Sequence, residues 1–314
     1  MVVGGVEVAA GTREQIHLPV ARYLTGEWMN LPVEVIHGSR PGPAIWMSGA
    51  IHGDELDGVE ITRGVSESLS PARLSGTVFA IPIVNVFGFL HGSRYLPDRR
   101  DLNRAFPGTE DGSMAARLAW LFTTEIVDRC EWGLDFHCGS GDRENLPQVR
   151  GDLEDEATRA VAEAFAPPLM IHNQGPEGSL RRSAIERGAR TLVFEGGEAG
   201  RFTQRSIEVG VSGALRVLRH LEMIGDAPAA TETPLRAAST HWVRASRSGI
   251  VRLQVELGEP VKKGKRIGEI TEILGSGRKR IRASNSGIVI GRRVTPLIYK
   301  GEALVHIARS EEGG

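Results

Sequence analysis

Ala44-Ile45-Trp46-Met47-Ser48-Gly49-Ala50-Ile51-His52-Gly53-Asp54-Glu55 joins an apolar run to a polar turn. The apolar half is typical of a strand buried on both faces, as in the sheet of an α/β protein. His52 and Glu55 lie three residues apart where that strand would end, so an imidazole nitrogen and a carboxylate oxygen can converge on one metal ion. For this segment alone, the plainer alternative is a core-edge histidine beside a glutamate that starts a helix.

Two further strand-like runs end in polar residues. Asp135-Phe136-His137 closes one run, and alternation along a strand places Asp135 on the face of His137, where it could orient a ligand or the local backbone. Together with His52 and Glu55, His137 completes a set of two histidines and one glutamate, which leaves a zinc coordination position open for water.

Glu195 closes the other run and is followed by two glycines. A carboxylate at the end of a buried strand is costly unless it is paired or functional. Glu195 is therefore the predicted general base and acid beside the metal, and a helix-capping or salt-bridged glutamate is the alternative.

The surrounding chain alternates strands and helices from about residue 30 to residue 225. Apolar runs predict strands at 44–51, 77–84, 132–136, 169–172 and 191–194, and helical periodicity predicts helices at 114–127, 157–166, 179–186 and 207–224. This pattern predicts the α/β class, with a mixed sheet flanked by helices and with sites at the carboxyl ends of strands. His52, His137 and Glu195 each fall at such an end.

The composition then changes. Residues 226–238 are typical of a linker, and in 239–314 short Val/Ile-rich runs separated by glycine replace the helical periodicity. A weak repeat, Ser248-Gly249-Ile250-Val251 and Ser286-Gly287-Ile288-Val289, predicts a small all-β barrel or sandwich domain. This domain resembles the biotinyl/lipoyl carrier type, but its hairpin tip at 275–280 lacks the methionines or acidic residues that flank the modified lysine of a carrier. A structural or substrate-gating module is the preferred interpretation.

Size and charge place the chain among ordinary globular proteins. Its 314 residues allow two domains, predicted at 1–225 and 239–314, and its formal net charge of −1 predicts no nucleic-acid and no membrane partner. No apolar run approaches the roughly 20 residues that span a bilayer, and the first residues lack a signal-peptide pattern. With only Cys130 and Cys138 in the sequence, a cytoplasmic location is expected.

An arginine-rich stretch runs from Arg94 to Arg104 between the first two ligand segments. Asn103 and Arg104 stand side by side, which suits recognition of a substrate carboxylate. Arg94 is the favoured residue to stabilise a developing oxyanion, with Arg99 and Arg100 as rivals. A solvated charged loop is the plainer alternative.

Four segments in this order resemble the succinylglutamate desuccinylase/aspartoacylase family, a branch of the zinc carboxypeptidase-like fold. They are Gly49-Ala50-Ile51-His52-Gly53-Asp54-Glu55, Asp101-Leu102-Asn103-Arg104-Ala105-Phe106-Pro107-Gly108, Asp135-Phe136-His137 and Phe194-Glu195-Gly196-Gly197. The resemblance covers roughly residues 30–225, and a following β-domain is typical of the two-domain members of that family.

The resemblance implies one zinc ion per chain held by His52, Glu55 and His137, with Glu195 as general base and acid. It also implies that Arg94 polarises the scissile carbonyl and that Asn103 and Arg104 bind the substrate carboxylate. A further arginine of the family, from the helix before the catalytic strand, corresponds to Arg181, with Arg182 as the alternative. Tyr299 is a candidate, by its position in the tail, for the tyrosine that helps to close the site in some relatives. Cys138 replaces the threonine or serine that often follows the third ligand.

We therefore expect a zinc-dependent amidohydrolase that removes an acyl group, of acetyl or succinyl type, from an N-acyl amino acid or a similar small carboxylate. A zinc metallocarboxypeptidase acting on short peptides is the nearest alternative. A non-catalytic metal- or ligand-binding protein is the second. The tail offers an interface for a homo-oligomer, although no sequence feature fixes the oligomeric state, the acyl group or the amine product.

Overall fold

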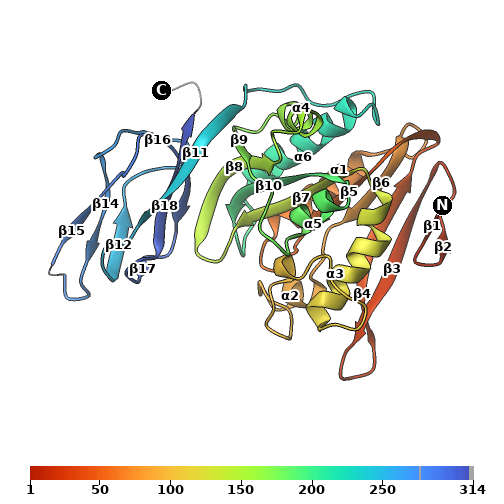
Figure 1. Ribbon diagram of the computed structural model, residues 1–314, viewed down its shortest axis with the longest axis horizontal. Coiled ribbons are helices and arrows are strands. Elements are labelled where there is room, and N and C mark those ends of the chain that lie inside the picture. Colours follow the sequence, from red (N-terminus) through yellow and green to blue (C-terminus); the bar gives the residue numbers. More distant parts are fainter. Residues whose placement is uncertain (276, 311–314) are drawn as a thin grey trace.

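One twisted sheet of twelve strands runs through the computed structural model, which describes residues 1–275 and 277–310 (Figure 1). Its strands, in spatial order, are β13 (Pro260–Val261), β16 (Gly287–Arg293), β18 (Ala303–Ser310), β11 (Leu235–Arg244), β9 (Leu169–His172), β8 (Arg143–Gly151), β10 (Arg190–Glu198), β7 (Trp132–Gly139), β5 (Arg40–Gly49), β6 (Ser75–Ile81), β4 (Trp28–His37) and β3 (Thr12–Arg22). Strands β10, β7, β5 and β6 are parallel neighbours, whereas β4 and β8 pair antiparallel to them. The mixed α/β sheet expected from the sequence is therefore confirmed.

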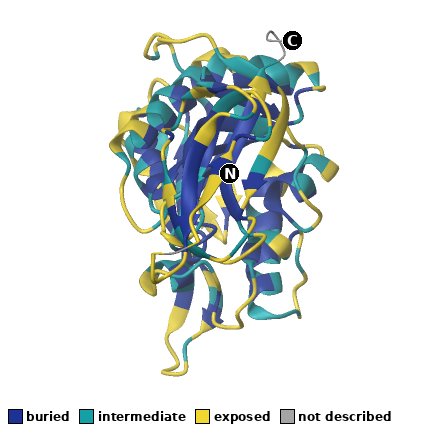
Figure 2. Cartoon of the chain, turned by 90° about the vertical axis from the view of Figure 1, so that its left-hand side faces the viewer, coloured by how far each residue is buried: buried dark blue, intermediate teal, exposed yellow. Residues whose placement is uncertain are grey.

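Helices cover both faces of this sheet, because successive side chains of β5 point alternately to the two faces and both faces are apolar. Ile45 and Met47 share one core cluster with α1 (Asp57–Ser68), α4 (Glu156–Phe165) and α6 (Gln204–His220). Trp46 faces the other cluster, which includes residues of α3 (Met114–Glu125) and α5 (Leu180–Glu186). The central strands are consequently buried on both sides, as the dark-blue strands in Figure 2 show. The short elements β1 (Val2–Val3), β2 (Val6–Glu7) and α2 (Val86–Leu90) complete this part of the chain.

Local sequence signals fix most of the helix starts. Ser113, predicted as the N-cap of the helix at 114–127, accepts a hydrogen bond from the Ala116 backbone N–H at 3.3 Å. Asp155 caps α4 and Ser179 caps α5 in the same way. The last predicted helix begins earlier than expected, at Gln204, and ends at His220. Strand β8 was missed because it contains Pro147 and lacks the apolar run that marks the other central strands.

The described chain from Leu235 onward forms strands only. Four of them extend the central sheet, because β11 pairs in parallel with β9 and β16 pairs antiparallel with β8. A second sheet has the order β15 (Lys279–Arg282), β14 (Arg266–Thr271), β12 (Gly249–Leu253) and β17 (Leu297–Ile298), seen at the left of Figure 1. Apolar residues contributed by both sheets form a separate core cluster.

The boundary of the tail differs from the expected linker at 226–238. Strand β11 begins at Leu235, because residues 235–237 pair with residues 169–171 of β9. The division of the chain into two domains stays a prediction. Ser276, in the predicted hairpin tip, and residues 311–314 lie outside the described residues. Within the described ranges, none of the helices combines the length and the apolar character that crossing a bilayer requires.

Candidate functional site

Three neighbouring parallel strands bring the candidate residues together. In the register of β7 with β10, His137 is the partner of Glu195, and in that of β5 with β7, Ser48 is the partner of Asp135. His52 and Glu55 lie on the loop that leaves β5, where Ala50 adopts a φ of 47° and the Glu55 backbone N–H donates to the His52 carbonyl. Four polar side chains from distant parts of the sequence thus meet at the carboxyl ends of these strands.

Glycine at position 53 lets this loop approach α2. A Cβ atom there would lie 2.0 Å from the carbonyl carbon of Gly88. No side chain larger than hydrogen fits against that backbone, so the loop that carries His52 and Glu55 depends on Gly53.

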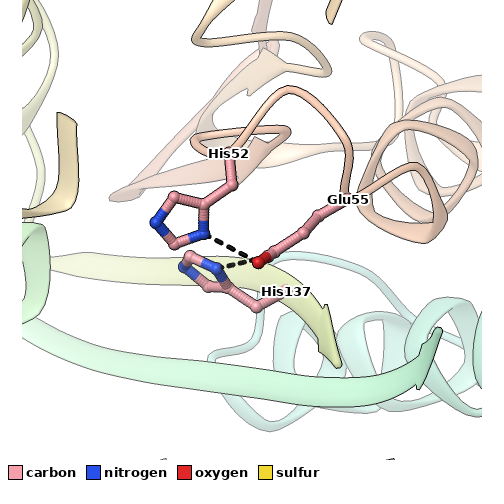
Figure 3. Close-up of side chains that lie close together, drawn as sticks. All are labelled: His52, Glu55 and His137. Atoms are coloured by element: carbon pink, nitrogen blue, oxygen red, sulfur yellow. Dashed lines mark hydrogen bonds and ion pairs between the residues drawn. The ribbon is translucent and has the colours of Figure 1, made fainter. Parts of the chain in front are cut away.

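His52, Glu55 and His137 form a compact buried cluster (Figure 3). The Nδ1 atom of His52 lies 2.8 Å from Oε1 of Glu55, and Nδ1 of His137 lies 2.7 Å from Oε2. Potential ligand atoms of the three residues all lie within 4.8 Å of one another. Two imidazoles and one carboxylate are a donor set that catalytic zinc sites use, with a position left open.

Each of the two histidines also contacts a carboxylate through its Nε2 atom. Nε2 of His52 lies 3.1 Å from Asp101, and Nε2 of His137 lies 2.7 Å from Asp135, as the strand alternation predicted. Asp135 in turn accepts a hydrogen bond from the Ser48 hydroxyl at 2.9 Å. Such contacts fix the Nε2–H tautomer and turn the Nδ1 lone pair toward the centre of the cluster. The sequence had given no role to Asp101.

The electrostatics of the cluster favour a cation at its centre. Burial opposes the charge on Glu55, yet the two imidazoles lower the pKa of its carboxyl. Burial also opposes charge on the histidines, but Glu55 and Asp101 raise the pKa of His52, and Asp135 and Glu55 raise that of His137. Three carboxylates around two imidazoles therefore hold positive charge strongly. A divalent cation would supply that charge in place of the protons, so the residues present fit zinc.

Arg94 borders the cluster. Its guanidinium lies 2.9 Å from Asp101 and 3.4 Å from Glu55, and Asn85 donates to its backbone carbonyl at 3.3 Å. The two rivals, Arg99 and Arg100, are exposed and do not line the cavity at the cluster. Of these three arginines, only Arg94 lines the cavity and contacts the cluster among the described residues.

Glu195 is held at both of its oxygens by strand β8. Asn145 donates to Oε2 at 3.0 Å, and Arg150 lies 3.3 Å from Oε1. Sequence reasoning missed both partners because it missed β8. These two contacts fix the orientation of the Glu195 carboxylate, which lines the same cavity as the cluster.

Asn103, Arg104 and Arg181 line the same cavity. Asn103 accepts a hydrogen bond from the Leu180 backbone N–H at 2.9 Å, which leaves its amide N–H groups for a ligand. Arg104 donates to the Asn103 carbonyl at 2.6 Å and meets no carboxylate within the described ranges. Burial and the neighbouring Arg150 lower the pKa of Arg181 to about 10, so its guanidinium stays charged at neutral pH.

Arg181 and its alternative, Arg182, have different surroundings. Arg181 is 7% exposed, donates to Asn173 at 2.8 Å and leaves Nε and Nη1 without a described hydrogen-bond partner. Arg182 pairs with Glu186 at 2.6 Å on the outer side of α5 and is not among the residues that line the cavity. The placement therefore favours Arg181 as the substrate contact.

The cavity has a volume of about 310 Å³, and part of its wall comes from the C-terminal strands. Trp242 and His306 form that part, whereas Tyr299 is 76% exposed and does not line the cavity. Cys138 also borders the cavity, but burial raises the pKa of its thiol well above the usual value. A protonated thiol is a poor metal ligand, in keeping with its interpretation as a small buried residue.

Comparison with known proteins identifies relatives of this arrangement. A family model of the succinylglutamate desuccinylase/aspartoacylase catalytic domain matches residues 41–221. The N-alpha-acetyl-L-2,4-diaminobutyric acid deacetylase of Halomonas elongata is 29% identical over 297 residues, which cover 90% of this chain and 86% of that protein.

Solved structures share the whole fold. A succinylglutamate desuccinylase/aspartoacylase from Rhodobacter sphaeroides superposes with a TM-score of 0.88 at 23% identity, covering 97% of this chain and 98% of that chain. The product-bound ectoine utilization protein EutE (DoeB) from Ruegeria pomeroyi gives a TM-score of 0.87 at 24% identity, covering 96% and 97%. Coverage of this extent includes the C-terminal strands as well as the central sheet.

Proposed function

Because this chain belongs to the succinylglutamate desuccinylase/aspartoacylase family, we propose that it is a zinc-dependent amidohydrolase that removes an acyl group from a small N-acyl amino acid. One observation carries the proposal: Glu195, oriented by Asn145 and Arg150, is the register partner of His137 in the His52–Glu55–His137 cluster. A site that only binds metal needs no oriented carboxylate beside its ligands, so the non-catalytic alternative is disfavoured.

His52, Glu55 and His137 would hold the zinc ion. Zinc bound there supplies a Lewis acid that polarises the amide carbonyl and acidifies water. Glu195 accepts the proton of the attacking water and then delivers it to the departing amine. Arg94, whose guanidinium borders the cluster, stabilises the negative charge that develops on the carbonyl oxygen.

Three other residues that line the cavity are assigned to substrate binding. The free amide N–H groups of Asn103 and the guanidinium of Arg104 bind the α-carboxylate of the N-acyl amino acid. Arg181, with two unpartnered N–H groups, binds a further acceptor of the substrate. This assignment gives a ligand to Asn103, Arg104 and Arg181, whose side chains pair with no carboxylate among the described residues.

Glu195→Gln tests the proposal. The substitution keeps the size of the side chain and removes its proton affinity, so zinc content is expected to stay at one ion per chain. Turnover of N-acetyl and N-succinyl amino acids is expected to fall by about 10²–10⁴-fold. Glu198→Gln, three residues farther along β10 and outside the cavity lining, is the matched control. Near-normal activity of Glu195→Gln would remove this residue from the proton-transfer role.

A zinc metallocarboxypeptidase is the second candidate, because it shares the metal and the recognition of a carboxylate. Trp242 and His306 line the cavity, whose volume of about 310 Å³ suits a small N-acyl amino acid better than a longer peptide. A panel of short peptides assayed beside N-acyl amino acids separates the two activities. Preferential cleavage of the peptides would favour the carboxypeptidase.

A further inference from the structure

A further buried carboxylate follows the loop that carries His52 and Glu55. Asp57 is the first residue of α1, two positions after Glu55, and its side chain is fully buried. The Oδ1 atom of Asp57 accepts a hydrogen bond from the Thr203 backbone N–H at 2.8 Å. Thr203 directly precedes α6, so this side chain joins the start of one helix to the start of another. Asp57 does not line the cavity, and the proposed chemistry gives it no direct contact with the substrate.

The segment that Asp57 holds is the turn that follows Glu195. The pairing of β10 with both β7 and β8 shifts register directly after Glu195, so the chain leaves the regular ladder at that point. Gly197, in this turn, has a φ of 78°. A Cβ atom at Gly197 would lie 2.2 Å from Oδ2 of Asp57 and 2.7 Å from Oγ1 of Thr203. The turn is therefore packed directly against the Asp57 carboxylate and the residue that this carboxylate binds.

The loop and the turn meet at one more point. The Gly200 backbone N–H donates to the Asp54 carbonyl at 2.8 Å. This contact joins two backbone groups, so no substitution of a side chain removes it. Asp57, in contrast, supplies a side-chain hydrogen bond between the two segments, and a substitution can remove that bond alone. The structure thus offers a way to loosen the turn after Glu195 while the metal ligands and the cavity lining stay unaltered.

We infer that Asp57 is a positioning residue, which fixes the place of Glu195 relative to the metal ligands and so supports proton transfer. The inference rests on the proposed function. Asn145 and Arg150 orient the Glu195 side chain from β8, whereas Asp57 holds the turn after Glu195 from α1. Proton transfer requires hydrogen-bond reach, and a misplacement of about 1 Å can cost about 100-fold in rate. The effect of losing Asp57 is therefore expected in kcat rather than in KM or zinc affinity.

Asp57→Ala tests the inference in the zinc-loaded full chain, assayed with N-acetyl and N-succinyl amino acids. It removes the acceptor of the Thr203 N–H, and kcat is expected to fall by about 10- to 100-fold while KM and zinc content change less than about twofold. Asp57→Asn, which keeps an oxygen for Thr203, is expected to retain kcat within about threefold. Thr62→Ala is the matched control in the same helix, because it deletes a buried hydroxyl that donates to the Gly58 carbonyl at 2.8 Å outside the cavity. Its kcat is expected to equal that of the unmodified chain.

A double-mutant cycle with Glu195→Gln separates positioning of Glu195 from a general structural effect. The residual turnover of Glu195→Gln does not depend on proton transfer by this residue, so adding Asp57→Ala is expected to lower it by less than about twofold. Should Asp57→Ala not fold, Asp57→Ser, which keeps a polar group at the start of α1, takes its place with the same expectations.

Three results would overturn the inference and leave the proposed function intact. The first is a kcat of Asp57→Ala equal to that of the unmodified chain, and the second is an equal fall of kcat in Thr62→Ala. The third is a loss on adding Asp57→Ala to Glu195→Gln as large as the loss in the unmodified chain, because Asp57 would then act independently of Glu195. No deacylation of any N-acyl amino acid by the unmodified chain would instead refute the proposed function.

Discussion

Asp135→Asn is predicted to weaken metal binding without unfolding the protein. Asp135 lies 2.7 Å from Nε2 of His137 and accepts a hydrogen bond from Ser48, and both aspartate and histidine are buried. An asparagine side chain has the same shape and keeps an oxygen for Ser48. Its amide group, however, presents N–H to Nε2 and so favours the tautomer that carries a proton on Nδ1, the atom directed at Glu55.

The size of the effect follows from this change of tautomer. Loss of a carboxylate behind a ligating histidine costs about 10- to 100-fold in metal affinity, equal to about 1.4–2.7 kcal/mol. Zinc affinity is measured by competition with a chromophoric chelator, and folding is checked by thermal unfolding of the metal-free protein. Asp128→Asn is the control, because the exposed Asp128 pairs with Arg187, away from the cavity and from any described group of potential metal ligands. An Asp135→Asn protein that binds zinc as tightly as the control would refute the reasoning.

Three further predictions concern the cluster and the core. Gly53→Ala places a Cβ atom against the Gly88 backbone. It is expected to destabilise the fold by about 1–3 kcal/mol, measured by denaturant titration, and to weaken zinc binding. Gly225→Ala is the neutral control, because a Cβ atom at that position meets nothing within 4 Å. The stabilisation by zinc is expected to grow from about pH 6 to pH 8. The raised pKa values of His52 and His137 stabilise the metal-free fold below the ordinary histidine pKa of 6.5, and this contribution is lost as the pH rises. The prediction is tested by the melting temperatures of the metal-free and the zinc-bound protein, whose difference should increase across this pH range. Phe165→Ala removes a fully buried ring stacked on Phe194 at 5.6 Å and is expected to cost about 3–5 kcal/mol in unfolding free energy without changing zinc affinity.

The candidate site could be predicted from the sequence because its residues lie near the ends of strongly apolar strands or just after them. His52, His137 and Glu195 are polar where a buried strand should continue, and parallel strands bring such ends to one edge of the sheet. The sequence does not give the register of these strands. The predicted site depended little on that register, since neighbouring strands are only about 4.8 Å apart. The roles assigned to these residues remain predictions for the experiments above.

The residues that surround the cluster and contact Glu195 could not be predicted from the sequence, because no strand pattern marks them. Asn145 and Arg150 lie on β8, whose mixed polar sequence has no strand signature, and their contacts with Glu195 depend on the antiparallel pairing with β10. Trp242 and His306 are far apart in the sequence and meet only through the pairing of β11 with β18. Asp101 lay within a recognised segment, yet only the folded loop shows that its carboxylate bridges His52 and Arg94.

The C-terminal strands and the proposed base belong to one continuous ladder. His306 pairs with Gly291 of β16, Gly291 pairs with Asn145 of β8, and Asn145 donates to Glu195. A Cβ atom at Gly291 would lie 2.9 Å from Oδ1 of Asn145, so the glycine is what lets β16 approach without displacing that amide. The tail therefore contributes to the candidate site in two ways: it supplies Trp242 and His306 to the cavity wall, and it pairs with the strand whose Asn145 contacts Glu195. A tail that only gated the cavity would need neither the pairing with β8 nor a glycine at this position.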